Sequence, residues 1–195
     1  MIKSICVFCG SSMGAKTAYS AAAHDLGVEL VHHNIALVYG GSSIGLMGLV
    51  ADSVMKHDGK AIGIIPHTLA QREIEHTGLT ELHVVDTMHQ RKEMMATHSD
   101  AFVAMPGGVG TFEELFEVLS WAQLGIHNKP ILLLNIEGYF DALINLIDHG
   151  VQEGFIRAED ADLVRVASTV DEVIPMLQAS PRQDFRPKYM DLGKT

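Results

Sequence analysis

The chain has 195 residues, of which 47% are hydrophobic and 19% charged, so it can form one domain with a buried core and is not a disordered protein. Asp and Glu number 24 against 14 Lys and Arg, which gives a formal net charge of −10. An acidic chain without a basic cluster is unsuited to nucleic acid or an anionic membrane surface, although a few local donors can still hold a small anion.

Short apolar runs alternate along the chain with longer segments of helical periodicity. Strands are predicted at Ser4–Cys9, Ala36–Tyr39, Ala61–Ile65, Leu82–Val85, Ala101–Met105, Ile131–Asn135 and Val164–Ala167. Helices are predicted at Thr17–His33, Leu46–His57, Met88–His98, Thr111–Leu124, Tyr139–Glu153 and Val170–Gln178. Continuous apolar runs are typical of parallel strands that are buried on both faces. We therefore predict an α/β fold, a doubly wound parallel sheet of about seven strands with helices on both faces.

The organisation outside this pattern is simple. Residues 1–179 are predicted to form one domain, and residues 180–195, which show little periodicity, a C-terminal tail. No apolar run reaches the roughly 20 residues of a membrane span, and the first residues do not have a signal-peptide pattern. Cys6 and Cys9 are three apart in a predicted strand, so their thiols should point to opposite faces rather than form a redox pair. These features predict a cytoplasmic protein.

Three glycine-rich loops, at residues 10–14, 40–45 and 106–111, follow predicted strands. Ligands bind at the carboxyl ends of the strands in such sheets. None of the loops has the spacing of a dinucleotide fingerprint or the ending of a P-loop, which disfavours an NAD oxidoreductase and an ATPase. Each loop leads toward a helix, whose free N–H groups can hold an anion. The alternative is that the glycines serve only tight turns.

The third loop is followed by two acidic residues, Glu113 and Glu114. One interpretation is structural, because the spacing from Thr111 to Glu114 is that of a capping box and acidic residues suit a helix start. The other is functional: a carboxylate beside a phosphate-binding turn can stabilise developing positive charge or orient a water molecule. Both interpretations remain open from the spacing alone.

Two adjacent cations, Arg91 and Lys92, stand near the start of a predicted helix, where they oppose the helix dipole. Such a local cost often marks a functional site, although an exposed basic pair is the plainer interpretation. Glu73 lies beyond the third predicted strand and can reach the same edge of the sheet, but alone it is typical of an ordinary surface charge. The 11 histidines are scattered without the spacing of metal ligands, so no metal site is predicted.

The segment Pro106–Glu114, PGGVGTFEE, resembles the PGGxGTxxE signature of the Lonely Guy (LOG) family, the cytokinin riboside 5′-monophosphate phosphoribohydrolases that are often labelled lysine decarboxylases. Residues 9–12, 39–48, 88–92 and 121–125 resemble further family motifs in the same order. The resemblance runs from about residue 7 to 130, and more weakly to about 177. Ser42 is a departure, because many members extend the glycine run there.

The resemblance implies a Rossmann-like sheet, a homodimer, no cofactor, and hydrolysis of the N-glycosidic bond of a nucleoside 5′-monophosphate, either AMP or an N6-substituted AMP. The products would be the free base and ribose 5-phosphate. Arg91 and Glu114 would carry catalysis. Further substrate contacts are expected from Gly10, Ser11, Gly40, Gly41, Glu73, Lys92, Gly107, Gly108, Val109, Gly110, Thr111 and Ser120.

Three alternatives compete with this function. A general AMP or nucleotide nucleosidase is barely separable by sequence, because contacts to the purine N6 would come from variable apolar residues. A non-catalytic nucleotide sensor, or a carrier of a phosphorylated cofactor, would bind without a need for Glu114. A pyridoxal-phosphate decarboxylase would need a buried Schiff-base lysine, and no lysine stands in an obvious apolar pocket. The apolar surface of residues 112–124 supports the homodimer.

Overall fold

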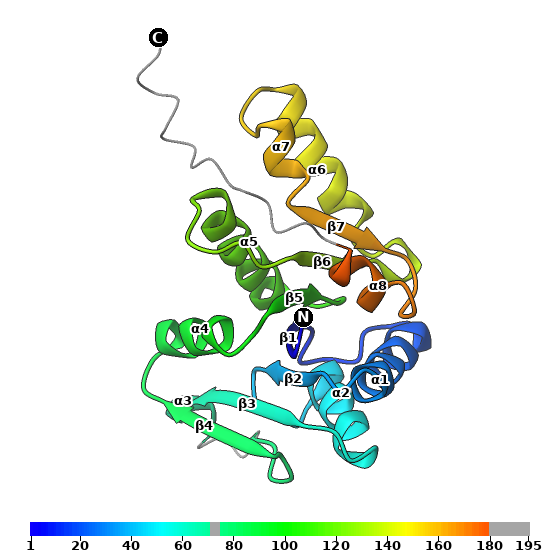
Figure 1. Ribbon diagram of the computed structural model, residues 1–195, viewed down its shortest axis with the longest axis vertical. Coiled ribbons are helices and arrows are strands. Elements are labelled where there is room, and N and C mark those ends of the chain that lie inside the picture. Colours follow the sequence, from blue (N-terminus) through cyan, green and yellow to red (C-terminus); the bar gives the residue numbers. More distant parts are fainter. Residues whose placement is uncertain (71–74, 180–195) are drawn as a thin grey trace.

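The structure is a computed structural model that describes residues 1–70 and 75–179. Seven parallel strands form one sheet in the order β4-β3-β2-β1-β5-β6-β7 (Figure 1). The strands are β1 (Ser4–Phe8), β2 (Ala36–Tyr39), β3 (Ala61–Pro66), β4 (Glu81–Val85), β5 (Ala101–Ala104), β6 (Ile131–Leu134) and β7 (Val164–Ala167). Each lies within a residue of its predicted bounds, and the α/β, doubly wound prediction is confirmed.

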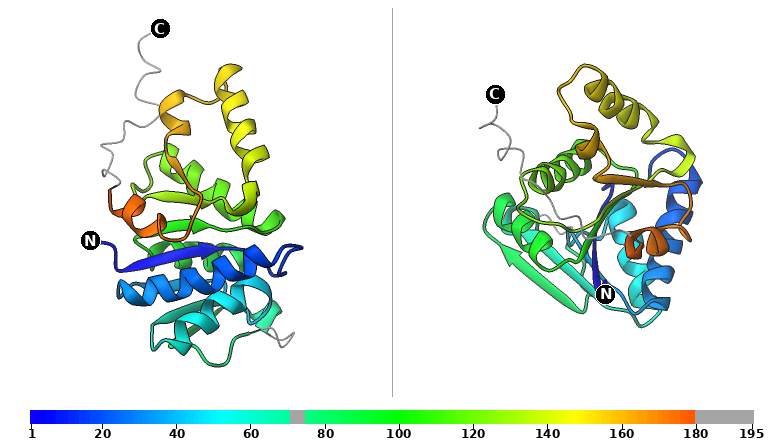
Figure 2. Two further views of the ribbon diagram at one scale, coloured as in Figure 1. Left: turned by 90° about the vertical axis from the view of Figure 1, so that its right-hand side faces the viewer. Right: turned by 45° about the horizontal axis from the view of Figure 1, so that its top comes forward.

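Helices cover both faces of the sheet (Figures 1 and 2). One face is covered by α1 (Thr17–His32), α2 (Gly45–Lys56) and α8 (Val173–Gln178). The other is covered by α4 (Met88–Thr97), α5 (Val109–Gln123) and α6 (Asp141–Gln152). The short helices α3 (His67–Ala70) and α7 (Ala158–Ala161) and the 3₁₀ turn η1 (Ile136–Gly138) were not expected from periodicity, because each is a single turn or less.

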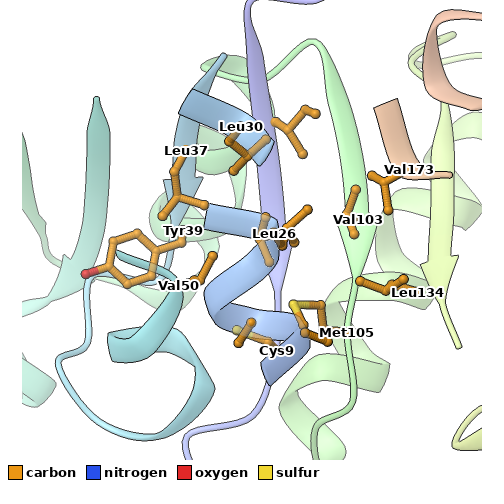
Figure 3. Packing of buried hydrophobic residues seen from close by; sticks show 14 of the residues in the cluster. Cys9, Leu26, Leu30, Leu37, Tyr39, Val50, Val103, Met105, Leu134 and Val173 are labelled. Carbon is orange, nitrogen blue, oxygen red and sulfur yellow. The ribbon is translucent and has the colours of Figure 1, made fainter. Parts of the chain in front are cut away.

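The apolar strand runs divide the core into two layers, because successive side chains of a strand point to opposite faces. Figure 3 shows the layer under α1, where Leu26 and Leu30 pack on the strands beside Leu37 and Val103. The second layer lies under α4 and α5. Cys9 belongs to the first layer and Cys6 to the second, and both thiols are buried and free, which confirms the prediction of divergent thiols.

The strand order reverses at β1, which lies between β2 and β5. The chain adds β2, β3 and β4 on one side of β1 and then returns to add β5, β6 and β7 on the other. At such a switch point the loops after the two neighbouring strands diverge and leave a crevice. Here these are the loops after β1 and β5, the first and third glycine-rich loops, which are joined by a 3.1 Å hydrogen bond from the Gly10 N–H to the Pro106 carbonyl.

The helix predicted at Tyr139–Glu153 begins later than expected, since α6 starts at Asp141. The side chain of Asn135 redirects the chain: its Oδ1 accepts the Phe140 N–H at 2.7 Å, and its Nδ2 donates to the Asp141 carboxylate at 2.8 Å. Gly138, with φ of 69°, completes the turn. Tyr139 therefore lies outside the helix. Among the described residues, no helix is long and apolar enough to cross a membrane.

Candidate active site

A pocket of about 280 Å³ opens at the switch point between β1 and β5. Its walls come from both glycine-rich loops, from α1 and α2, and from the segment before α6. The lining residues are Gly10, Ser11, Ser12, Gly14, Tyr19, Leu46, Pro106, Gly107, Gly108 and Tyr139. The fold thus brings four of the predicted substrate contacts, Gly10, Ser11, Gly107 and Gly108, around one cavity at the ligand-binding edge of the sheet.

Helix α5 begins at Val109, with Gly108 as its N-cap and no side-chain cap. Its first helical hydrogen bond runs from the Phe112 N–H to the Gly108 carbonyl at 3.1 Å. The N–H groups of Val109, Gly110 and Thr111 precede that bond and have no acceptor within the helix. The helix dipole adds partial positive charge at this end, so the turn is suited to an anion.

The capping-box interpretation of Thr111 and Glu114 is wrong. A capping box needs its Thr at the N-cap, and Thr111 stands three residues inside the helix. The Thr111 hydroxyl instead lies against the Cα of Gly107, where a Cβ would overlap it and crowd the Gly10 backbone. Gly107 is therefore required for close packing. By contrast, a Cβ on Gly108 would meet no atom within 4 Å, so this glycine leaves open space at the turn.

Arg91 is a buried cation, 6% exposed, that α4 carries to the same edge of the sheet. Its Nε donates to the carbonyl of Ile64 in β3, at 3.1 Å. A Cβ added to Gly40 would lie 1.9 Å from Arg91 Nη2, which is an overlap, and 3.2 Å from the Met47 sulfur. The second glycine-rich loop therefore provides the space that the guanidinium occupies.

The Arg91 Nη1 donates to Glu114 Oε1 at 2.7 Å, and the carboxylate, 9% exposed, is buried as well. A guanidinium has five N–H donors, and two of those of Arg91 are bound to described residues, so three have no partner among the described residues. No described residue hydrogen-bonds Glu114 Oε2 either. Burial raises the pKa of Glu114, although the charge of Arg91 and its hydrogen bond lower it. The pKa of Glu114 is therefore closer to neutral pH than that of an ordinary glutamate, and its Oε2 has no partner among the described residues.

Lys92, the second cation of the pair, turns toward α5 rather than solvent. Its Nζ lies 2.5 Å from Glu113 Oε1 and 2.9 Å from Glu117 Oε1, and its side chain is only 10% exposed. Burial lowers the pKa of Lys92, but hydrogen bonds and charge from the two glutamates outweigh it, so the pKa is raised overall. The interpretation of an exposed basic pair is therefore wrong, because carboxylates of α5 hold both cations.

The start of α4 is fixed by a capping box that the sequence reasoning missed. The Thr87 hydroxyl accepts the Gln90 N–H at 3.1 Å, and the Gln90 side chain accepts the Thr87 N–H at 3.1 Å. This pair places the cations in the second turn of the helix. The signal was present in the sequence as Thr87-x-x-Gln90 before a helical run.

Comparison of the sequence with known proteins identifies the family of this chain. The family model described as "Possible lysine decarboxylase" matches residues 47–177. Cytokinin riboside 5′-monophosphate phosphoribohydrolase LOG3 of Arabidopsis thaliana is 56% identical over 176 residues, which cover 89% of this chain and 81% of that protein. The probable enzyme LOGL6 of Oryza sativa subsp. japonica is 53% identical over 181 residues, 92% of this chain and 72% of that protein. The chain belongs to the LOG family.

Solved structures resemble this LOG-family chain in fold. The molybdenum cofactor carrier protein MCP from Chlamydomonas reinhardtii superposes with a TM-score of 0.70 at 21% identity, covering 92% of this chain and all of that one (100%). The molybdenum cofactor binding protein from Rippkaea orientalis gives 0.68 at 20% identity, covering 91% and 96%. At this identity the likeness shows the fold alone.

Of the remaining predicted contacts, the ones that the structure describes do not line the pocket. The Gly41 carbonyl accepts the His76 N–H at 2.9 Å, and the Val109 side chain is 82% exposed. Gly110 is in the first turn of α5, and a Cβ there would meet open space. Ser120 is exposed two turns beyond Glu113 and does not join the pocket within one chain. Glu73 lies outside the described residues.

Sequence reasoning missed some contributors to this site. Tyr19 and Tyr139 line the pocket, and Met47 connects two loops by donating its N–H to the Gly10 carbonyl at 3.3 Å. Glu117 was not predicted to bind Lys92. Of these, only Glu117 had a usable signal, because it stands one turn from Glu113 on the same helix face. The tyrosines reach the pocket through tertiary packing alone.

One lysine does stand in a partly apolar pocket, contrary to the expectation. Lys129 lines a second pocket of about 500 Å³ with Phe102 and Trp121 on the flank of α4 and α5, and burial lowers the pKa of this lysine. Its ammonium group donates to the Ala96 carbonyl at 2.6 Å, near the end of α4. This lysine is thus engaged with the helix end and is not part of the glycine-loop pocket, so it offers little support for a decarboxylase.

Proposed function

We propose that the chain hydrolyses the N-glycosidic bond of cytokinin riboside 5′-monophosphates, releasing the free base and ribose 5-phosphate. The observation that carries the proposal is the buried pair of Arg91 and Glu114, whose glutamate stands on α5 five residues after Val109, the first residue of that helix. Among the described residues, three N–H donors of Arg91 and Glu114 Oε2 have no hydrogen-bond partner. Relatives at 51–56% identity that are named for this activity support it.

The phosphate would bind at the start of α5. The N–H groups of Val109, Gly110 and Thr111 lie there without an acceptor in the helix, and Gly108 leaves room for an oxygen-rich group. Backbone donors of this kind need no cationic surface, so they can act in a chain of net charge −10. Anchoring the phosphate uses binding energy remote from the reacting bond to hold the ribose in place.

Breaking the C1′–N bond leaves an oxocarbenium-like sugar, and the electron pair of the bond departs with the base. The carboxylate of Glu114 would stabilise that positive charge and accept a proton from the attacking water through Oε2. Its raised pKa makes it a better proton acceptor than an ordinary glutamate. Arg91 would hold Oε1 and use its remaining N–H donors for ribose hydroxyls or the phosphate.

A homodimer is proposed on the flank of α5. Exposed apolar side chains gather on and after this helix: Val109 is 82% exposed, Phe116 37%, Leu124 39% and Ile126 65%. Such a concentration of apolar surface is typical of an interface. Light scattering in solution should give twice the mass of one chain, and a monomeric mass would contradict the proposal. The net charge of −10 supports a protein that binds neither nucleic acid nor an anionic membrane surface.

The direct test is incubation with isopentenyladenosine 5′-monophosphate and, in parallel, AMP, followed by separation of the products. We expect free base and ribose 5-phosphate from both, with the higher kcat/KM for the N6-substituted nucleotide. Faster turnover of AMP would favour the general nucleosidase. Binding without release of base would favour a non-catalytic carrier or sensor and contradict the proposal.

The role of the carboxylate is tested by Glu114→Gln, which preserves shape but removes the charge. We expect kcat to fall by about 100-fold or more, the range for loss of a preorganised electrostatic group. The matched control is Glu93→Gln, the same chemical change at an exposed residue of α4, which should leave kcat unchanged. Near wild-type activity in Glu114→Gln would show that the carboxylate is only structural.

A further inference from the structure

Tyr139 stands between the 3₁₀ turn η1 and α6, in the bend that Asn135 fixes. Its phenol hydroxyl donates a hydrogen bond to the carbonyl of Gly107. The two residues are 32 positions apart in the sequence, and both line the pocket at the switch point. The hydroxyl thus contacts the glycine turn that precedes α5.

The Tyr139 ring is held by other aromatic rings, independently of its hydroxyl. Tyr19 meets it edge-on, with centroids 5.8 Å apart, and Phe140 does so at 5.0 Å. Phe112, in the first turns of α5, lies nearly parallel to it at 6.5 Å. Because ring contacts depend on the shape of the ring, a phenylalanine at this position should keep them. The hydroxyl is therefore separable from the packing.

The hydrogen bond to Gly107 determines the orientation of one peptide group. In a trans peptide the C=O of one residue and the N–H of the next point in opposite directions. Holding the Gly107 carbonyl on the side of Tyr139 therefore directs the Gly108 N–H to the other side. The preceding peptide is held in the same way, because the Pro106 carbonyl accepts the Gly10 N–H at 3.1 Å.

A Gly-Gly turn that is not held in this way would sample several peptide orientations, because glycine has few steric restraints. The cost of ordering it would then be incurred when an anion binds. This ordering cost should be largest at Gly108, because a Cβ there would meet no neighbour within 4 Å and packing therefore does not restrain the residue. Tyr139 supplies a restraint that the local sequence lacks.

We propose that Tyr139 is a positioning residue that preorganises the Pro106–Gly108 turn for the 5′-phosphate of the substrate. The single proton of its hydroxyl is donated to the Gly107 carbonyl, so Tyr139 acts through the turn and does not donate to the ligand. The identity of the anion as a sugar phosphate rests on the proposed function. The preorganisation itself concerns binding and does not require turnover.

The test compares Tyr139→Phe with Tyr39→Phe by calorimetric titration with ribose 5-phosphate and by steady-state kinetics. Tyr39 is a matched control, because its hydroxyl is buried, has no partner among the described residues and points away from α1 (Figure 3). For Tyr139→Phe we expect the Kd for ribose 5-phosphate and the KM to rise about tenfold, equivalent to one hydrogen bond, while kcat changes little. The Kd for free adenine should not change. Tyr39→Phe should match the wild type in both Kd values, in KM and in kcat.

Rescue separates positioning from simple stability. Replacing Tyr139 with 4-aminophenylalanine restores an N–H donor at the same ring position and should return the Kd toward the wild-type value. If Tyr139→Phe folds less stably but binds ribose 5-phosphate as tightly as the wild type, the inference is overturned. Equal weakening for adenine and ribose 5-phosphate would overturn it as well. A wild-type protein that binds ribose 5-phosphate without hydrolysing nucleotides would refute the proposed function. The ratio of the Kd values of Tyr139→Phe and wild type for ribose 5-phosphate would still decide the role of Tyr139.

Discussion

The guanidinium of Arg91 occupies the place where a side chain on Gly40 would begin, since a Cβ there would overlap Nη2. Gly40 belongs to the loop after β2, and Arg91 to α4, which follows β4. The contact brings together two sequence features that were interpreted separately, a glycine loop and a basic pair. It indicates that this glycine makes room for a catalytic candidate, whereas the N–H groups without an acceptor in the helix belong to the first turn of α5.

Gly40→Ala should therefore displace Arg91 without unfolding the protein. We expect kcat/KM to fall by about 100-fold, because a shift of about 1 Å in a positioning group costs that much. Circular dichroism should show an unchanged fold. The control is Gly78→Ala, where the added Cβ would meet only the His76 ring, at 3.4 Å, so activity should be unaffected. Full activity in Gly40→Ala would mean that the guanidinium can move without consequence.

The raised pKa of Glu114 predicts the acid side of the pH profile. If the carboxylate form is the active one, kcat/KM falls as the pH drops through that raised pKa. The midpoint should therefore lie above 4.5, the ordinary value for a glutamate. Steady-state rates from pH 4 to 8 measure it, and Glu93→Gln should give the same midpoint as the wild type. A midpoint at or below 4.5 would refute the assignment.

The same shift predicts how Glu114 affects stability. A carboxyl group whose pKa is higher in the folded than in the unfolded chain binds its proton more tightly when folded. Its contribution to the free energy of unfolding is therefore largest below its ordinary pKa and is lost as the pH rises through the raised value. The Tm of Glu114→Gln relative to wild type should consequently increase with pH, as thermal scans between pH 4 and 8 would show. A difference that is independent of pH would contradict this.

The capping box at the start of α4 should support the site indirectly. Thr87→Ala removes the acceptor for the Gln90 N–H and should lower the free energy of unfolding by about 1 kcal/mol. For a chain of this size the Tm should fall by about 2–4 °C, measured by calorimetry. Thr87→Ser keeps a hydroxyl and should restore most of the loss, whereas Thr97→Ala, at the exposed end of the helix, should have no such effect. Equal losses in all three variants would argue against capping.

The ion pair of Lys92 and Glu117 should show energetic coupling. Both side chains are mostly buried, at 10% and 23% exposure, so the pair is screened less than a surface pair. Urea unfolding of Lys92→Met, Glu117→Gln and the double variant should give a coupling energy of about 1 kcal/mol. Strict additivity of the two single variants would mean that the contact contributes nothing measurable.

Most of the fold could be predicted from the sequence because it follows from local patterns of apolar residues. The continuous apolar runs of β1, β2 and β5 are typical of a parallel sheet with helices on both faces, and the order of elements then placed the glycine-rich loops at one edge. The errors came at helix starts. At α5 the glycine turn winds into the helix two residues earlier than Thr111, and at α6 the Asn135 side chain delays the start, an effect that periodicity does not encode.

What the sequence determined by itself about this protein is its fold class, its family signature and the residue types available for chemistry. Only the tertiary structure decided how those residues are used. It paired Arg91 with Glu114, turned Lys92 inward between two glutamates, and brought Tyr139 to Gly107. The reason is physical: periodicity and spacing report contacts within an element, whereas burial, pKa shifts and hydrogen bonds between distant segments arise only when the elements pack together.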